Sequence, residues 1–332
     1  MLPVGTVLFT SRAGIGKTAI LSRKGCTNQG FQSIVPHKDE LDSYFIFSRT
    51  EELKRYGESV GSGSTFAEVS GKQMANMELM MPKTLVEQKT IGQYFASIDN
   101  LITLHQRKYD KLTKVKKSML EKMFPKNGAN VPEIRFKGFS DAWEQRKLGE
   151  MGQTYTGLSG KTKDDFGHGQ ARFVTYMNVF SNPISNPEMT EPIEIDPKQN
   201  EVEVGDVFFT TSSETPEEVG MSSILLEKRG KTYLNSFCFG FRPSEKIDSY
   251  YLAYMLRSES ARAKITLLAQ GISRYNISKN KVMEIAVSLP SLDEQKMIGQ
   301  YFSQLDNLIT LHQRELEKLK NIKKACLEKM FV

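Results

Sequence analysis

EQKTIGQYFASIDNLITLHQRKYDKLTKVKKSMLEKMF, residues 87–124, decides the fold, because it recurs at residues 294–331 as EQKMIGQYFSQLDNLITLHQRELEKLKNIKKACLEKMF. The two stretches align without a gap at an offset of 207 residues, and 26 of the 38 paired positions are identical. Solenoid repeats have periods of only about 20–50 residues. The much longer spacing therefore indicates a duplicated module.

Apolar side chains recur at steps of three or four residues through both stretches, which predicts one long helix in each copy. The apolar seam continues for about five heptads. The polar residues His105 and Lys116 interrupt it where His312 and Lys323 interrupt the second copy. Two such helices in one chain most simply pack on each other. The alternative, a helix buried in an ordinary bundle, would rarely need 38 residues.

Composition places the chain among ordinary globular proteins of about two domains, with 332 residues of which 39% are hydrophobic. The three cysteines, Cys26, Cys238 and Cys326, lack metal or disulfide spacing, which is typical of a reduced cytoplasmic protein. The start of the sequence has no signal-peptide pattern, and no apolar run predicts a membrane span. We therefore expect a cytoplasmic protein without a membrane partner.

The formal net charge of +6 lies in the repeated stretches. Residues 87–124 carry +4 and residues 294–331 carry +2, so the rest of the chain sums to zero. A nucleic-acid-binding surface outside the predicted helices must therefore be a local patch.

The duplication extends into the globular parts with weaker identity. Val4–Thr10 is similar to Val204–Thr210. The alternating apolar residues of 77–81 and 285–289 predict a strand before each long helix. We expect each module to be an α+β domain followed by its helix, with a further helix at Ser249–Leu256. The first module has no counterpart of roughly residues 131–200, so it can bury less core.

The run Val131–Glu150, VPEIRFKGFSDAWEQRKLGE, resembles the opening of a target recognition domain in the specificity subunit of type I restriction-modification systems. Three further stretches resemble the same family: Pro290–Lys296 (PSLDEQK), more loosely Pro82–Lys89, and Gly271–Asn276 (GISRYN). The resemblance covers essentially the whole chain, and the internal repeat makes it specific.

The resemblance implies an α+β fold with two target recognition domains, the first one truncated, joined by two long antiparallel coiled-coil helices. Each domain would read one half of a split DNA target, and the helices would act as a spacer. A rod of about 57 Å limits the separation of the half-sites to roughly 17 base pairs. The implied parts are a partial first recognition domain (1–84), the first spacer helix (85–124), a linker (125–130), the second recognition domain (131–291) and the second spacer helix (292–332).

The resemblance also implies partners and excludes catalysis. The helices would dock two copies of a methyltransferase subunit, and restriction and translocase subunits would complete the complex on double-stranded DNA. The specificity subunit is not an enzyme and needs no cofactor. The alternative is a truncated or silent specificity cassette that acts only as a coiled-coil scaffold without intact bipartite DNA recognition.

Residues 12–18, RAGIGKT, are similar to a phosphate-binding P-loop, but Ser11 stands where that motif needs its first glycine. We interpret them as a glycine-rich turn after the strand Val7–Thr10. Its backbone could approach a DNA phosphate, with Arg12 or Lys17 adding charge. A purely structural turn and a P-loop ATPase that binds nucleotide through Lys17 are the alternatives.

The second globular part holds the other candidate DNA contacts. Lysines suit phosphates, hydroxyls suit phosphates or bases, and arginine and asparagine can read guanine and adenine through paired hydrogen bonds. For each of these residues a solvated loop side chain is the competing interpretation. The candidates are Lys161, Lys163, Arg172, Thr210, Thr211, Ser212, Arg274, Tyr275 and Asn276.

Two patterns suggest functions that we reject. Asn182-Pro183 and Asn186-Pro187 lack the second proline and the aromatic residue of a methyltransferase signature. His105 and His312 lie at equivalent seam positions, where a polar residue more often sets helix register than binds metal. We expect no metal site.

Overall fold

A computed structural model describes residues 1–61, 67–126 and 128–331. The chain divides into two compact units: unit 1 contains residues 1–110 and 310–332, and unit 2 contains residues 111–309. Both units mix helices and strands, which agrees with the expected class. The division between the units falls within both long helices, because residues of each repeated stretch, 87–124 and 294–331, pack against the cores of both units. The domain bounds at residues 84, 130 and 291 stay a prediction.

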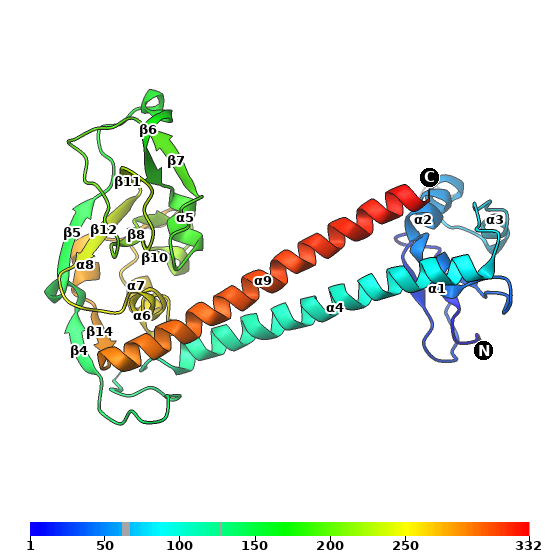
Figure 1. Ribbon diagram of the computed structural model, residues 1–332, viewed down its shortest axis with the longest axis horizontal. Coiled ribbons are helices and arrows are strands. Elements are labelled where there is room, and N and C mark those ends of the chain that lie inside the picture. Colours follow the sequence, from blue (N-terminus) through cyan, green and yellow to red (C-terminus); the bar gives the residue numbers. More distant parts are fainter. Residues whose placement is uncertain (62–66, 127, 332) are drawn as a thin grey trace. The chain divides into compact units, whose positions relative to one another are not determined.

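The long helices are α4 (Leu85–Lys122) and α9 (Leu292–Met330), which have 38 and 39 residues (Figure 1). Neither they nor any other described helix is long and apolar enough to cross a membrane. Residue 127, in the predicted linker, and residue 332, at the end of the predicted second helix, lie outside the described residues.

The two helices contact each other through equivalent ion pairs. In unit 1, Lys323 Nζ lies 2.6 Å from Asp99 Oδ1. In unit 2, Lys116 Nζ lies 2.5 Å from Asp306 Oδ1. Within unit 1, Asp99 pairs with Lys323 and His105 with His312, so the two helix segments of that unit run antiparallel. These pairs also explain why a lysine interrupts each apolar seam.

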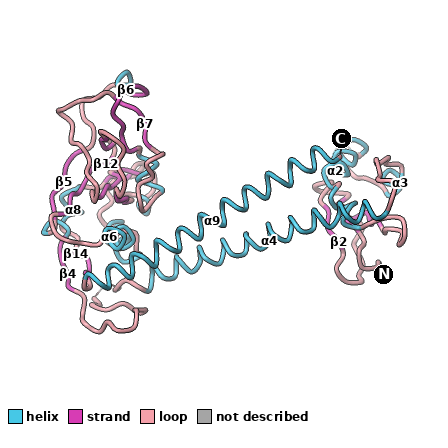
Figure 2. The backbone as a smooth tube through the Cα atoms, viewed as in Figure 1, coloured by secondary structure: helices cyan, strands magenta, loops and turns pink. Residues whose placement is uncertain are grey.

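Unit 1 contains a three-stranded antiparallel sheet in the order β2-β1-β3. Val7 and Phe9 of the central strand pack with Phe45 and Leu53 in a small core. Figure 2 shows the short strands among helices and loops. The described elements are β1 (Val7–Thr10), β2 (Thr18–Ile20), β3 (Phe31–Ile34), α1 (Ser43–Ser48), α2 (Thr50–Val60) and α3 (Gly71–Ala75), besides its share of the long helices.

Unit 2 contains a four-stranded sheet, β10-β8-β12-β5, and a three-stranded sheet, β11-β6-β7. Val207 and Phe209 face the larger core, and Phe208 faces a smaller one on the other side of the sheet. The elements are β4 (Glu144–Lys147), β5 (Gly152–Thr156), β6 (Phe166–Val174), α5 (Tyr176–Ser181), β7 (Thr190–Ile193), β8 (Val207–Thr210), β9 (Ser212–Ser213), β10 (Ser222–Ile224), β11 (Thr232–Leu234), β12 (Cys238–Pro243), α6 (Ser249–Met255), α7 (Glu259–Thr266), β13 (Tyr275–Asn276), α8 (Lys279–Met283), β14 (Ala286–Leu289) and the 3-10 turns η1 (Leu148–Glu150), η2 (Lys163–Asp165) and η3 (Pro216–Glu218).

Each long helix is anchored to its module by the same contact. Asp42 caps α1 and Asp248 caps α6, and each carboxylate accepts a backbone N–H at 2.8 Å. The backbone N–H of Asp42 donates to Gln88 Oε1 at 3.1 Å, and that of Asp248 donates to Gln295 Oε1 at 3.0 Å. The repeat therefore preserves the junction between helix and domain as well as the helix itself.

The strand predicted at residues 77–81 is wrong. In unit 2 the equivalent strand β14 forms because it pairs with β4, with Val287 opposite Arg146. Residues 77–81 have no such partner among the described residues, and they form no strand. A strand needs a neighbour to satisfy its backbone groups, so the alternating pattern alone was insufficient.

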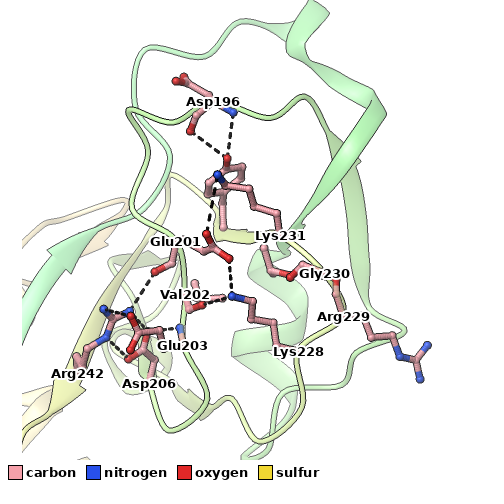
Figure 3. Close-up of polar contacts among 12 residues, drawn as sticks. Asp196, Glu201, Val202, Glu203, Asp206, Lys228, Arg229, Gly230, Lys231 and Arg242 are labelled. Atoms are coloured by element: carbon pink, nitrogen blue, oxygen red, sulfur yellow. Dashed lines mark hydrogen bonds and ion pairs between the residues drawn. The ribbon is translucent and has the colours of Figure 1, made fainter.

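In unit 2, Arg242 of β12 pairs with Asp206, which lies immediately before β8 (Figure 3). Arg242 donates to both carboxylate oxygens of the buried Asp206, at 2.8 Å each. Tyr155 Oη donates to Asp206 Oδ2 at 2.5 Å. Burial and the neighbouring carboxylate raise the pKa of Tyr155, which keeps this hydroxyl protonated.

Candidate nucleic-acid interface

Unit 2 brings two separately predicted groups of residues together. β9 pairs with β13, so Ser212 lies opposite Asn276 and Ser213 lies opposite Tyr275. Ile277 N–H also donates to the Thr211 carbonyl at 2.9 Å. The hydroxyl-rich end of β8 and the 274–276 stretch therefore form one surface.

Arg274 lies in a loop on this surface, immediately before β13. Gln270 and Asn276 exchange two backbone hydrogen bonds, which close the loop between them. The Arg274 side chain is exposed, and its Cζ lies 6.0 Å from the ring centroid of Phe237. An arginine beside an aromatic ring can contact phosphates, stack on bases or read guanine.

Phe237 was missed by the sequence reasoning. It is 55% exposed in the turn between β11 and β12, and its carbonyl accepts hydrogen bonds from the backbone and hydroxyl of Thr211. The available signal was a large apolar side chain in a short turn between two strands. Its position places an exposed ring next to Arg274.

A cleft of about 380 Å³ lies beside the loop. Tyr176 Oη donates to the Ser212 carbonyl at 2.7 Å, and burial raises the pKa of Tyr176. Glu218 accepts a hydrogen bond from Ser213, so the cleft carries carboxylates as well as Arg274. Carboxylates can accept from cytosine, so this mixture suits base edges better than a row of phosphates. The lining residues are Tyr176, Met177, Phe180, Ser212, Ser213, Glu214, Glu218, Ser273 and Arg274.

Two partly buried arginines position the walls of the cleft. Arg257 donates to the carbonyls of Val179 and Phe180 at 2.9 and 3.0 Å, which holds the end of α5. Arg262 donates to the carbonyls of Val219 and Gly220 at 2.6 and 2.7 Å. Burial lowers the pKa of each to about 10, so both remain charged near neutral pH. The sequence did not indicate them, because both bind backbone carbonyls, which every residue type has, and no acidic partner marks them in the sequence.

Three of the predicted contacts serve the fold. Thr210 is fully buried, and its hydroxyl accepts from the Met221 N–H at 3.0 Å. Thr211 donates its hydroxyl to the Phe237 carbonyl at 2.9 Å. Arg172 donates to Thr190 Oγ1 at 2.6 Å across β6 and β7. We therefore do not include these side chains among the proposed DNA contacts.

The two predicted lysines of unit 2 differ. Lys161 is mostly buried and lies 2.9 Å from Asp196, and this hydrogen-bonded pairing raises the pKa of Lys161. Lys163 is exposed in η2 and makes no ion pair within the described part of the chain. Lys163 is therefore the better candidate for a phosphate contact.

The RAGIGKT stretch forms a turn in unit 1. Gly14 and Gly16 have φ angles of 110° and 98°, which glycine adopts readily. Arg12 lies 2.6 Å from Glu68, whereas Lys17 is exposed. The turn leads into strand β2, whereas a P-loop leads into a helix. The P-loop alternative is therefore wrong, and Lys17 stays a candidate phosphate contact.

His105 and His312 meet in unit 1 with their Nδ1 atoms 3.1 Å apart. Burial, with the nearby His105 and Lys108, lowers the pKa of His312. Across residues 1–61, 67–126 and 128–331 there is no group of three metal-ligating side chains. The pair instead joins the two helices through a hydrogen bond that needs at least one neutral ring.

We expect unit 1 to lose stability as the pH falls below about 6.5. Because the folded pKa of His312 is depressed, the unfolded chain binds the proton first, and protonation favours unfolding. Above that pH both states are neutral and the effect is absent. Thermal unfolding followed by circular dichroism at several pH values measures it. A His105→Asn/His312→Asn variant should flatten the dependence, and an unchanged slope would contradict this assignment.

Comparisons with known proteins agree on one family. The family model for the type I restriction modification DNA specificity domain matches residues 1–114 and 140–321. The chain is 24% identical over 323 residues to the type I restriction enzyme MjaVIII specificity subunit of Methanocaldococcus jannaschii, covering 92% of this chain and 73% of that protein.

Solved structures share the fold. The type I restriction-modification system S subunit from M. genitalium has a TM-score of 0.62 at 15% identity, covering 100% of this chain and 84% of that one. The HsdS subunit from Thermoanaerobacter tengcongensis has a TM-score of 0.51 at 19% identity, covering 99% and 81%.

Proposed function

Because this chain belongs to the DNA specificity family of type I restriction-modification systems, we propose that its unit 2 reads one half of a split target in double-stranded DNA. It is a specificity subunit, a non-catalytic component of such systems. The observation that carries the proposal is the exposed Arg274 beside Phe237 at the rim of the cleft. Tyr275 and Asn276 follow Arg274 in β13, and Ser212, which is only 4% exposed, lines the cleft.

Unit 1 would serve the other half of the target, with Arg12 and Lys17 near phosphates and the long helices as a spacer. The shared junction contacts of Gln88 and Gln295 support a common architecture for both arms. A coiled-coil scaffold without bipartite recognition is the second candidate. It is favoured by the small three-stranded sheet of unit 1. Either form would work in the cytoplasm, where the DNA is.

Selection of DNA from a random-sequence pool tests the reading function. The chain, alone and with its methyltransferase partner, should enrich a defined half-site, and binding to that site should survive added salt better than binding to random DNA. Enrichment of a single half-site would support recognition by unit 2 alone. Enrichment of two half-sites at a fixed spacing would support bipartite recognition. If binding is unselective and is lost on adding salt, the DNA-reading function is contradicted and the scaffold function remains.

The helices carry matching exposed leucines that suit partner docking. Leu101 and Leu104 are 44% and 45% exposed, and their repeat equivalents Leu308 and Leu311 are 44% and 52% exposed. Exposed apolar positions on a helix favour contact with another protein. We assign each leucine pair to the docking of one methyltransferase subunit, and the restriction and translocase subunits complete the assembly.

Replacing Leu101 and Leu104 with aspartate should reduce the bound methyltransferase subunits from about two copies to one. Native mass spectrometry of the purified complex counts them. The Leu308→Asp/Leu311→Asp variant is the matched counterpart and should have the same effect. The variant with all four substitutions should bind no methyltransferase subunit. Circular dichroism checks that the helices persist. Two copies on either double variant would place the docking surface elsewhere.

A further inference from the structure

Unit 1 leaves one edge of its sheet open where unit 2 has a strand. In unit 2, β12 pairs with β8 on one side and with β5 on the other. The equivalent strand of unit 1, β3, pairs with β1 and has no second partner among residues 1–61, 67–126 and 128–331. An unpaired strand edge presents N–H and C=O groups that can accept another strand.

The two edges correspond residue by residue. Thr10 pairs with Phe31 in unit 1, as Thr210 pairs with Cys238 in unit 2. Ile34 therefore corresponds to Phe241, which lies opposite Thr154 of β5. A proline follows β3 at Pro36, and a proline ends β12 at the corresponding position, Pro243. Three residues of β3, Gln32 to Ile34, correspond to residues of β12 that pair with β5.

An apolar groove of about 540 Å³ continues from this edge. Met77 and Leu79, which line it, correspond to Ile285 and Val287 of unit 2. There the Ile285 carbonyl accepts from the Leu148 N–H at 3.1 Å, and Val287 pairs with β4. The groove therefore lies where β4, η1 and β5 lie in unit 2. Its other apolar lining residues include Ile34, Leu41, Ile46, Leu53, Met74 and Met81.

We propose that this edge and groove bind a β-strand segment from outside residues 1–332, of the type formed by residues 144–156. The chain's own copy is not free, because β4 is paired with β14 and β5 with β12. A second copy of the chain holds its segment in the same way. The occupant adds a fourth strand antiparallel to β3, and its apolar side chains fill the groove.

One position sets the specificity of the new strand. In unit 2, the Tyr155 ring lies over Gly240, so close that a Cβ there would be 2.1 Å from it. Unit 1 has Ser33 at the equivalent position, and a tyrosine opposite it would clash. Thr6 and Val35 stand where Asp206 and Arg242 bind that tyrosine. The occupant therefore carries a small side chain opposite Ser33.

A pair of synthetic peptides tests the inference. One has the sequence of residues 142–157, and the other carries Tyr155→Val. Each peptide carries a fluorescent label and is titrated with the full chain. The Tyr155→Val peptide should bind about tenfold more tightly than the unchanged peptide, because it removes the clash with Ser33. Hydrogen exchange should show that the peptide protects backbone amides within Phe31–Ile34.

Variants of Ser33 distinguish the clash between the Tyr155 ring and the Ser33 side chain from non-specific binding of the peptide. Ser33→Gly should restore tight binding of the Tyr155 peptide, whereas Ser33→Ala, which keeps a Cβ, should not. Thermal unfolding of both variants checks that unit 1 still folds. Equal affinity of the two peptides on all three proteins, or no protection of β3 by either peptide, would overturn the inference. So would self-association of the peptide-free chain that protects β3, which would identify a second copy as the occupant.

Discussion

Replacing Arg135 with alanine is expected to lower the free energy of unfolding of unit 2 by about 3–5 kcal/mol. Arg135 Nε and Nη2 lie 2.7 and 2.8 Å from the two carboxylate oxygens of Glu294. The Glu294 side chain is only 1% exposed, so removing the guanidinium leaves a buried, unpaired carboxylate. Denaturant unfolding followed by the fluorescence of Trp143, the single tryptophan and a buried one, reports on unit 2.

The repeat supplies the control for this experiment. Glu87 is the equivalent of Glu294 in the first copy, and it is exposed. Glu87→Gln should change the free energy of unfolding by less than about 0.5 kcal/mol, whereas Glu294→Gln should be strongly destabilising. A small effect of Arg135→Ala would show that water reaches Glu294 and that the pair contributes little.

Replacing Arg274 with alanine is expected to weaken binding to the selected half-site by about ten- to a hundredfold, or about 1–3 kcal/mol. The side chain is exposed in the loop immediately before β13. If it reads guanine, the variant should also lose discrimination at one base pair of the site. Competition gel shifts with sites altered at single positions measure both effects.

Lys163→Ala is the matched comparison, since Lys163 is an exposed cation in the same unit. A phosphate contact predicts a uniform loss across DNA sequences and a shallower salt dependence. If Arg274→Ala behaves like Lys163→Ala, the arginine contacts phosphate and the reading groups lie elsewhere in the cleft. If it has no effect, the loop is not part of the interface.

Much of the candidate site could not be predicted from the sequence because its residues are joined by long-range pairing. Ser212 and Asn276 are 64 positions apart and become neighbours only through β9 and β13. Lys161 is a residue type that often contacts DNA phosphates, but here its ammonium group forms an ion pair with Asp196. A charge pattern shows that a cation is present, and tertiary contacts decide whether it is available.

The amino-acid sequence by itself determined the two long helices and their equivalence. Helical hydrogen bonds are local, so the repeated apolar seam was enough to place α4 and α9. Tertiary structure decided which extended segments became strands, because each strand depends on a distant partner. The pattern at 285–289 formed β14 against β4, while the same pattern at 77–81 formed no strand.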